Sequence, residues 1–216
     1  MKEKIIIIFA LFFGLSISTS FAQDWAAAIK VSTMGGNIDV YRSFGEKFNI
    51  HVGYNYFALT QSLGETIDYK TEGKIGLSSI SALGDFFPFE SSTFRITGGI
   101  MYNLNIIDAT LTPAREYEVG GDKYSPEELG NLMANIEFNK FSPYLGLGFG
   151  NPTSGNSGFG FVFDVGTMYQ GTAIVDLNAE GLLKPSANEE QAQKIQDNLS
   201  WFKWYPVLSL GLTYKF

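Results

Sequence analysis

Cysteine is absent from this 216-residue sequence, and histidine occurs only once, as His51. The lack of cysteine excludes a disulfide framework, and a lone histidine with no cysteine or second histidine is a poor transition-metal site. Glycine-rich runs such as Gly146 to Gly150 lack the lysine and the strand-to-helix context of a phosphate loop. We therefore predict no catalytic, cofactor-binding or metal-binding residues and no enzymatic activity.

Basic residues are also scarce, because 15 lysines and arginines face 22 acidic residues, for a net charge of −7. An acidic balance argues against nucleic acid as a partner. Beyond the N-terminus no segment approaches the ~18 consecutive apolar residues of a spanning helix. The mean hydropathy is nevertheless slightly positive, at +0.03.

Aromatic residues and glycine are abundant: aromatics make up 15% of the chain, with 19 phenylalanines, and glycines number 24. In a membrane β-barrel, rings face lipid and form girdles, while glycine allows strands to bend and leaves space in a narrow lumen. The composition therefore favours a barrel over a helical membrane protein.

The N-terminus has the features of a signal peptide. Lys2 and Lys4 precede an apolar stretch from Ile5 to Ile17, and Ser20-Phe21-Ala22 forms a small-x-small cleavage site. The alternative, an uncleaved anchor, is disfavoured because the stretch is shorter than the ~20 residues of a spanning helix. We predict a cleaved signal peptide at 1–22 and an outer-membrane barrel domain at 23–216. Cleavage removes two lysines and one glutamate, leaving a net charge of −8.

Apolar residues alternate with small or polar ones along most of the remaining chain. In Phe159–Tyr169 the odd positions are almost all apolar, while Gly160, Asp164 and Gly166 lie on the other face. This period of two is typical of strands. Because no amphipathic helix is available to cover so many apolar faces, lipid is the simplest cover.

Seven segments alternate clearly: 36–43, 48–60, 74–87, 94–107, 133–150, 158–170 and 204–216. If both chain ends are periplasmic the number must be even, so we add Trp25–Ser32 as the first strand.

Short turns alternate with long loops at 61–73, 108–131 and 171–200, and a bulge is expected within 74–87. The prediction is an all-β, eight-stranded, antiparallel up-and-down transmembrane barrel with structured extracellular loops. Those loops include a helix over 188–199 and a helical turn near 126–132.

The last strand ends in Phe216, with Leu212 and Tyr214 on the same face. This pattern resembles the signal read by the outer-membrane assembly machinery. The alternative is an ordinary amphipathic terminal strand, and the predicted signal peptide favours the assembly signal.

Six ionisable residues are predicted to face the lumen: Lys30, Asp39, His51, Asp85, Arg95 and Asp164. Two interpretations remain open. Either these groups pair across a closed interior, which eight strands make just wide enough for side chains to fill, or they line a narrow wet path whose charge selects solutes. A lumen-facing His51 is also unsuited to an outer-membrane deacylase, whose catalytic residues would face lipid.

Several stretches together resemble the CarO-type ornithine-uptake porin family and, more distantly, OmpW-like barrels. They are Phe141 to Gly150, Phe163-Asp164-Val165-Gly166 with Tyr169-Gln170-Gly171, Trp204-Tyr205-Pro206-Val207, and Asp108-Ala109 with Tyr117, Gly120, Gly121 and Tyr124. The resemblance covers about residues 30–216. It implies an eight-stranded barrel with capped outer loops and a role in passing basic amino acids.

We therefore expect a narrow outer-membrane channel for small solutes such as basic amino acids. The alternative is a structural or surface-interaction barrel with a sealed lumen and no transport. The expected partners are outer-membrane lipid and lipopolysaccharide, the assembly machinery and, for a channel, small solutes; no cofactor and no nucleic acid are expected.

Overall fold

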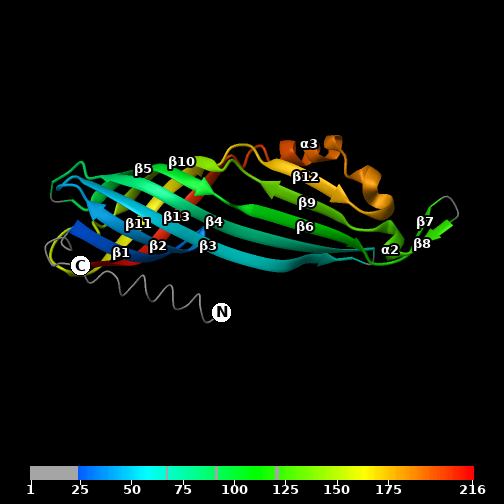
Figure 1. Ribbon diagram of the computed structural model, residues 1–216, viewed down its shortest axis with the longest axis horizontal. Coiled ribbons are helices and arrows are strands. Elements are labelled where there is room, and N and C mark those ends of the chain that lie inside the picture. Colours follow the sequence, from blue (N-terminus) through cyan, green and yellow to red (C-terminus); the bar gives the residue numbers. More distant parts are fainter. Residues whose placement is uncertain (1–23, 67, 91, 120–121) are drawn as a thin grey trace.

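The computed structural model describes residues 24–66, 68–90, 92–119 and 122–216 (Figure 1). The predicted signal peptide at 1–22 lies outside these residues. Eight strands form a ring: β1 (Trp25–Ser32), β2 (Gly35–Ser43), β3 (Phe48–Glu65), β4 (Tyr69–Phe86), β5 (Phe94–Asn103), β10 (Phe141–Phe149), β11 (Gly158–Tyr169) and β13 (Trp204–Lys215).

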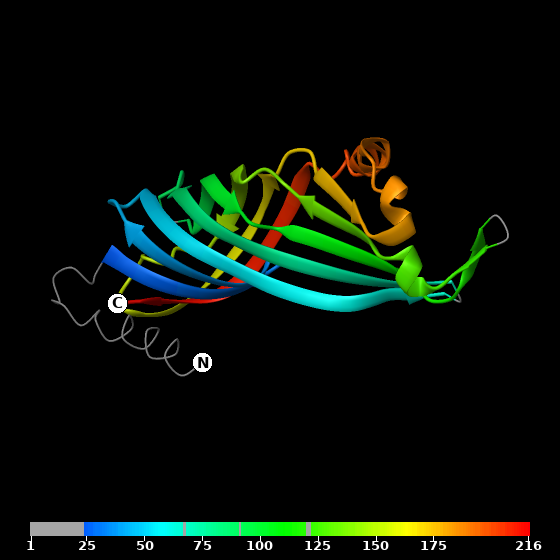
Figure 2. The ribbon, with the colours of Figure 1, turned by 45° about the vertical axis from the view of Figure 1, so that its right-hand side comes forward.

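The ring is closed and antiparallel throughout. Each strand pairs with its neighbour along the ring, β5 pairs with β10, and β13 joins β11 on one side to β1 on the other. Closure leaves no open edge in this part of the molecule, which a structure in hydrocarbon requires. The predicted eight-stranded fold is confirmed, and the first strand has the predicted bounds, Trp25–Ser32. Figure 2 shows the strands of the ring curving around the barrel.

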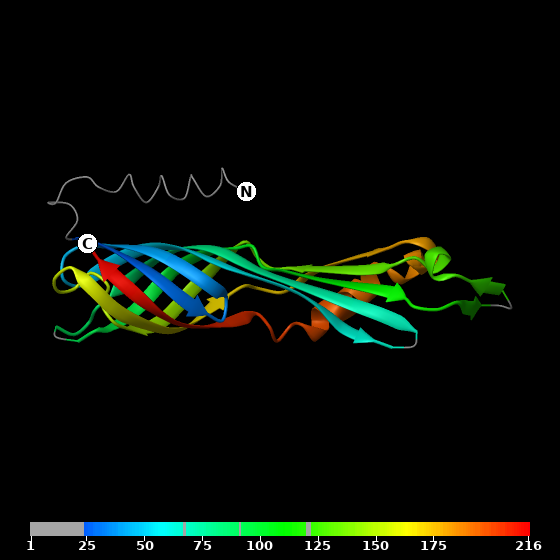
Figure 3. The ribbon, with the colours of Figure 1, turned by 90° about the horizontal axis from the view of Figure 1, so that it is seen from below.

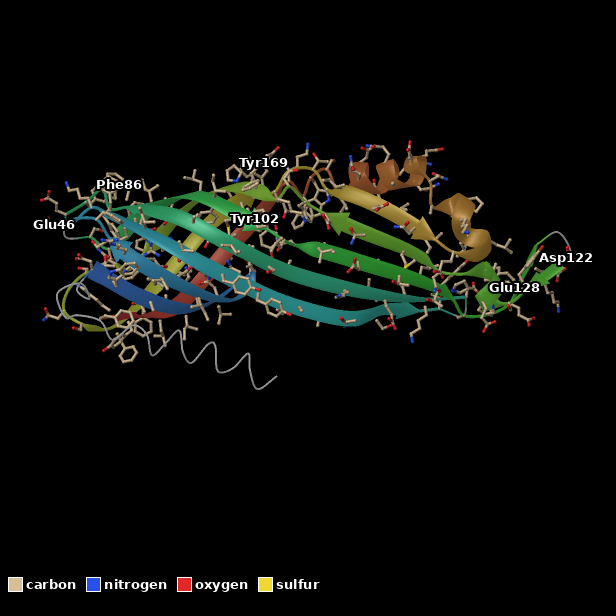
Figure 4. The ribbon with its side chains drawn as sticks, in the orientation of Figure 1. Glu46, Phe86, Tyr102, Asp122, Glu128 and Tyr169 are labelled. Atoms are coloured by element: carbon tan, nitrogen blue, oxygen red, sulfur yellow. The ribbon has the colours of Figure 1, made fainter. Side chains whose placement is uncertain are left out.

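The outer surface of the ring is apolar, with an aromatic girdle at each end. One girdle includes Phe48 against Phe86 and Phe94 against Phe149, and the other includes Tyr102 against Phe141 and Tyr169 against Trp204. Figure 4 shows Phe86 near one end of the barrel, and Tyr102 and Tyr169 near the other.

The spacing of the girdles matches a membrane. On β11, Phe159 and Tyr169 belong to opposite girdles and lie ten residues apart. At ~3.3 Å per residue and a tilt of ~40°, this separation spans about 25 Å, the height of the apolar band of outer-membrane barrels. Exposed Ile, Val and Leu side chains lie between the girdles, among them Ile29, Ile100, Leu145 and Leu210.

The C-terminus, the start of β1 and the short turns after β2, β4 and β10 lie at one end of the molecule (Figures 1 and 3). The other end carries β6 (Ile106–Pro113), β9 (Leu132–Glu137), β12 (Ile174–Ala179), the hairpin β7 (Tyr117–Val119) and β8 (Asp122–Tyr124), and the helices α2 (Pro126–Leu129), η2 (Gly181–Ser186) and α3 (Glu189–Asn198). Following the rule of short periplasmic turns, this second end is extracellular.

The predicted long loops are wrong in one respect, because each contains strand residues: β3 and β4 extend into 61–73, most of β6 and all of β7 and β8 lie within 108–131, and β12 lies within 171–200. β3 continues beyond the barrel and ends at Glu65, and β4 begins at Tyr69 and returns to the barrel. Beyond the barrel β6 pairs with β4, β9 pairs with β6, and β12 pairs with β9. We call the sheet formed by β6, β9, β12 and the parts of β3 and β4 beyond the ring (57–65 and 69–78) the extension. The ladder continues because every added strand satisfies the backbone groups of the previous edge.

Two predicted strands are accordingly divided. Segment 94–107 breaks between β5 and β6, and 133–150 breaks between β9 and β10. Both breaks allow the chain to leave the ring and return to it. The bulge expected within 74–87 is also wrong, since the register shift lies at Ser62/Gly64 instead.

The two predicted helical segments are present. Asn188 caps α3 by accepting from the backbone N–H of Gln191, and Ser125 and Glu128 form a capping box on α2. Within the described residues, no helix is long and apolar enough to cross a membrane.

The position of the apolar band can be tested with a charge. Val165 lies on the outer face of β11, near the middle of the span from Phe159 to Tyr169. We expect Val165→Arg to lower the free energy of unfolding by ~2–4 kcal/mol, since arginine is costly at mid-depth. Thr110→Arg, on the extension, is the control and should change it by less than about 0.5 kcal/mol. Urea titration in lipid vesicles measures both, and equal effects would contradict the assigned band.

Candidate functional site

The structure places all six predicted lumen-facing residues inside the barrel, each on a different strand. None is more than 7% exposed. Lys30 lies on β1, Asp39 on β2, His51 on β3, Asp85 on β4, Arg95 on β5 and Asp164 on β11.

Arg95 and Lys30 connect the three aspartates. The Arg95 guanidinium lies 2.5 Å from Asp164 Oδ1 and 3.3 Å from Asp85 Oδ1. Lys30 Nζ lies 2.5 Å from Asp39 Oδ2 and 3.5 Å from Asp164 Oδ2. Charges removed from water require such partners. The network therefore cross-links β1, β2, β4, β5 and β11 through the interior.

His51 fills the remaining gap in this network. Its Nδ1 lies 3.8 Å from Asp39 Oδ1, and its Nε2 lies 3.6 Å from Asp85 Oδ1. The imidazole stacks on the buried ring of Tyr41, with 4.4 Å between ring centroids. With a protonated His51 the six residues carry three positive and three negative charges, so their sum is zero.

Hydroxyl groups add hydrogen bonds to two of the carboxylates. Thr97 donates to Asp85 at 2.6 Å, and Ser209 donates to Asp164 at 3.0 Å. Arg95 also donates to the carbonyl of Gly150. The two hydroxyls bind Asp85 Oδ1 and Asp164 Oδ2, oxygens that also face Arg95 and Lys30, and each added hydrogen bond lowers the cost of burying the carboxylate.

Glycines provide the space that the network occupies. A Cβ on Gly148 would lie 2.6 Å from Oδ1 of Asp164 and 2.8 Å from Cζ of Arg95, and a Cβ on Gly53 would overlap Asp39. At Gly148 the backbone of β10 thus packs directly against the charges.

An apolar layer lies between the network and the extracellular end of the barrel. It consists of Met34, Leu83, Met101, Tyr144, Met168 and Val207, each 8% exposed or less. Met34 reaches it from the turn between β1 and β2. The cavity beside Lys30, Asp39, His51 and Asp164 has a volume of only about 40 Å³, which is room for a few water molecules.

The periplasmic end is closed by the turn after β10. Buried Thr153 donates to Asn49 at 2.9 Å, and Asn49 donates to Asn151 at 3.2 Å. Outside this contact lies an open vestibule of about 540 Å³, lined in part by Lys47, Phe87 and Glu90. The interior is therefore filled in three layers.

Alternation in the sequence indicates which residues face inward, but it does not identify the residues that seal the lumen. Leu83, Met101 and Met168 are apolar residues at inward positions, and this is the sequence feature that could have predicted the apolar layer, which we call the apolar plug. Tyr41, by contrast, follows the alternation of β2 but reveals its stacking on His51 only in the structure. Met34 lies in a turn and has no periodic signal.

Leu212, Tyr214 and Phe216, the predicted assembly signal, are all exposed on the outer face at the C-terminal end of β13. Tyr214 packs edge-on against Phe159 and Phe216. The three side chains thus contribute to the apolar band and the periplasmic girdle. Their recognition by the assembly machinery stays a prediction.

Comparison with known proteins gives matches among solved structures, while no family model and no curated protein matches. Acinetobacter baumannii CarO is 21% identical, with a TM-score of 0.56, over 88% of this chain and 97% of CarO. Acinetobacter baumannii CarO2 is 20% identical, with a TM-score of 0.59, over 89% and 98% of the two chains.

The chain has the CarO fold. The predicted resemblance is confirmed at this level, since the match spans nearly the whole of both chains. Together with the closed ring and the two aromatic girdles, this fold makes the chain an outer-membrane β-barrel. At this identity the similarity to CarO concerns the fold and not the solute.

Removing one member of the charge network tests its contribution. Arg95→Met leaves Asp85 and Asp164 without their shared guanidinium partner, and we expect a loss of ~3–5 kcal/mol in the free energy of unfolding. Adding Asp164→Asn should restore part of this loss, because one uncompensated carboxylate disappears. Urea titration in vesicles gives the double-mutant cycle. A single-variant loss below about 1 kcal/mol would show that the pairs are not formed.

The glycine contacts allow a matched comparison. Gly148→Ala pushes a methyl group against Asp164 and Arg95, so we expect a loss of ~1–3 kcal/mol. Gly84→Ala is the control, because its Cβ would point away from the lumen and meet no atom closer than 3.8 Å. Unfolding midpoints of the two variants should differ clearly; a neutral Gly148→Ala would contradict the close packing.

Proposed function

We propose that the protein is an outer-membrane barrel with a sealed lumen, which anchors the extension at the cell surface. The observation that carries this proposal is the filled interior. From the extracellular to the periplasmic end of the barrel, the lumen contains the apolar plug, then the paired charge network, then the closing turn after β10. The cavity of about 40 Å³ within it is too small for an amino acid. Of the two alternatives predicted from the sequence, this geometry favours the sealed barrel.

A narrow channel for small cationic solutes is the second candidate. Asp39, Asp85 and Asp164 lie in the lumen, and the vestibule of about 540 Å³ opens toward the periplasm. Carboxylates lining a path favour cations, in agreement with the role in passing basic amino acids that the resemblance implies. Transport would require Arg95, Lys30 and His51 to exchange their carboxylate partners for the solute and the apolar plug to move aside.

Liposome swelling separates the two candidates. Vesicles containing the purified protein should swell no faster in isosmotic lysine or ornithine than vesicles without protein, because the paired charges and the plug close the path. A general porin in the same lipid serves as the positive control. Swelling that is faster in lysine than in an uncharged solute of similar size would overturn the sealed lumen and establish the cation channel.

A further inference from the structure

The apolar side of β3 and β4 reverses where these strands leave the barrel. Up to Tyr56 the apolar side chains of β3 face outward, whereas beyond it Phe57, Leu59 and Leu63 lie on the face that continues the lumen wall. The outward positions there are Ala58, Thr60 and Ser62. On β4 the inward positions are Ile75 and Leu77, while Glu72 and Lys74 point outward.

Strand register carries this apolar face across the whole extension. Because directly opposite residues share a face, the pairs Ile75 with Ile107 and Ile107 with Ile136 extend it to β9. We call this surface the inner face. It comprises Phe57, Leu59, Leu63, Ile75, Leu77, Ile107, Leu111, Leu132, Ala134, Ile136, Val175 and Leu177.

Helix α3 and η2 lie beside β12 at the edge of the extension (Figure 1). They overhang part of the inner face and leave a hollow of about 630 Å³ beneath them. Figure 3 gives the view from below. Leu111, Leu132 and Leu177 line it from the sheet, and Gln191 and Ile195 line it from the helix. None of the described side chains that line it is charged. The volume is that of a small-molecule site, and the lining favours an uncharged, apolar occupant.

The inner face is open sideways at the height of the membrane surface. β1 and β2 end at the turn around Met34, and Gly36 of β2 pairs with Tyr56. β3 continues to Glu65 without a partner on that side. Phe57 and Leu59 are 40% and 42% exposed there, directly above the outward-facing Tyr56. The inner face is therefore continuous with the lipid-facing surface of the barrel.

From this continuity we propose that the inner face binds the hydrocarbon tail of a single-chain amphiphile, which enters from the outer leaflet through the gap above the β1–β2 turn. Exposed apolar area of this kind marks a binding surface, and a tail already dissolved in lipid reaches it without crossing water. The outward side of the extension carries Lys74, Asp108 and Asp176 and remains solvated. The inference holds whether or not the lumen conducts.

Binding of cis-parinaric acid, a fluorescent fatty acid, tests the proposal with the full barrel in lipid nanodiscs. Leu132→Gln places an amide on the inner face, and Met133→Gln places the same amide on the outward face of the same strand. We expect wild type to bind saturably above the level of empty nanodiscs, Leu132→Gln to bind about tenfold more weakly, and Met133→Gln to match wild type. Electrophoretic mobility of unboiled samples verifies that each barrel is folded.

The proposal is overturned if wild type shows no saturable binding above empty nanodiscs, or if the two variants bind alike. It is also overturned if the inner face is buried against a second copy, detected as cross-linked dimers that Leu132→Gln abolishes. Swelling assays on the same preparations keep the proposals apart. Loss of fatty-acid binding with an impermeable lumen rejects this site alone, and permeability with intact binding rejects the sealed lumen alone.

Discussion

Within hydrocarbon a backbone amide that has no partner costs several kcal/mol, so the pairing of β13 with β1 is the contact on which the other strands depend. Seven registered pairs, from Ala26 with Lys215 to Ser32 with Ser209, remove the last open edge. Only a closed ring can present Ile, Val and Leu to lipid on every strand. The same closure creates an interior from which water is largely excluded, and this determines what the inward residues must be.

The interior contains charge, and its arrangement follows from the cost of desolvation. Each cation reaches two carboxylates, and no aspartate of the network depends on a single partner. Such a network is weak evidence for stability compared with an apolar core, but breaking it is expensive. Its six members lie on six strands, so it favours a single register around the ring. Glycines at 53 and 148 are part of this arrangement, because any larger residue would displace the carboxylates.

The barrel could be predicted from the sequence because, within the membrane, the apolar face of every alternating strand must point outward to lipid. Asp85, Arg95 and Asp164 were assignable to the lumen in this way, whereas their pairing depends on the stagger between distant strands, which no local pattern contains. The extension was predicted as loops because its apolar residues change face. Ile75 and Leu77 appear out of phase with Ile80 and Ala82, and the change was interpreted as a bulge. Over Lys74–Phe86 the register with β3 in fact continues without a shift, and the surroundings change instead.

That reversal of phase marks the point at which lipid ceases to be the solvent. Below Tyr56, outward apolar side chains are stabilised by hydrocarbon. Above it the outward side meets water, so Lys74 and Glu72 occupy it and the apolar residues turn inward. In a soluble β-sheet such a face would be covered by a second layer. Here α3 and η2 cover only the region nearest β12, while Phe57 and Leu59 on the β3 side remain exposed. An apolar surface of this extent, open at the membrane boundary, is costly to leave in water. For this reason the hydrocarbon tail proposed to lie on the inner face would continue, on the opposite side of the sheet, the lipid contact of the barrel.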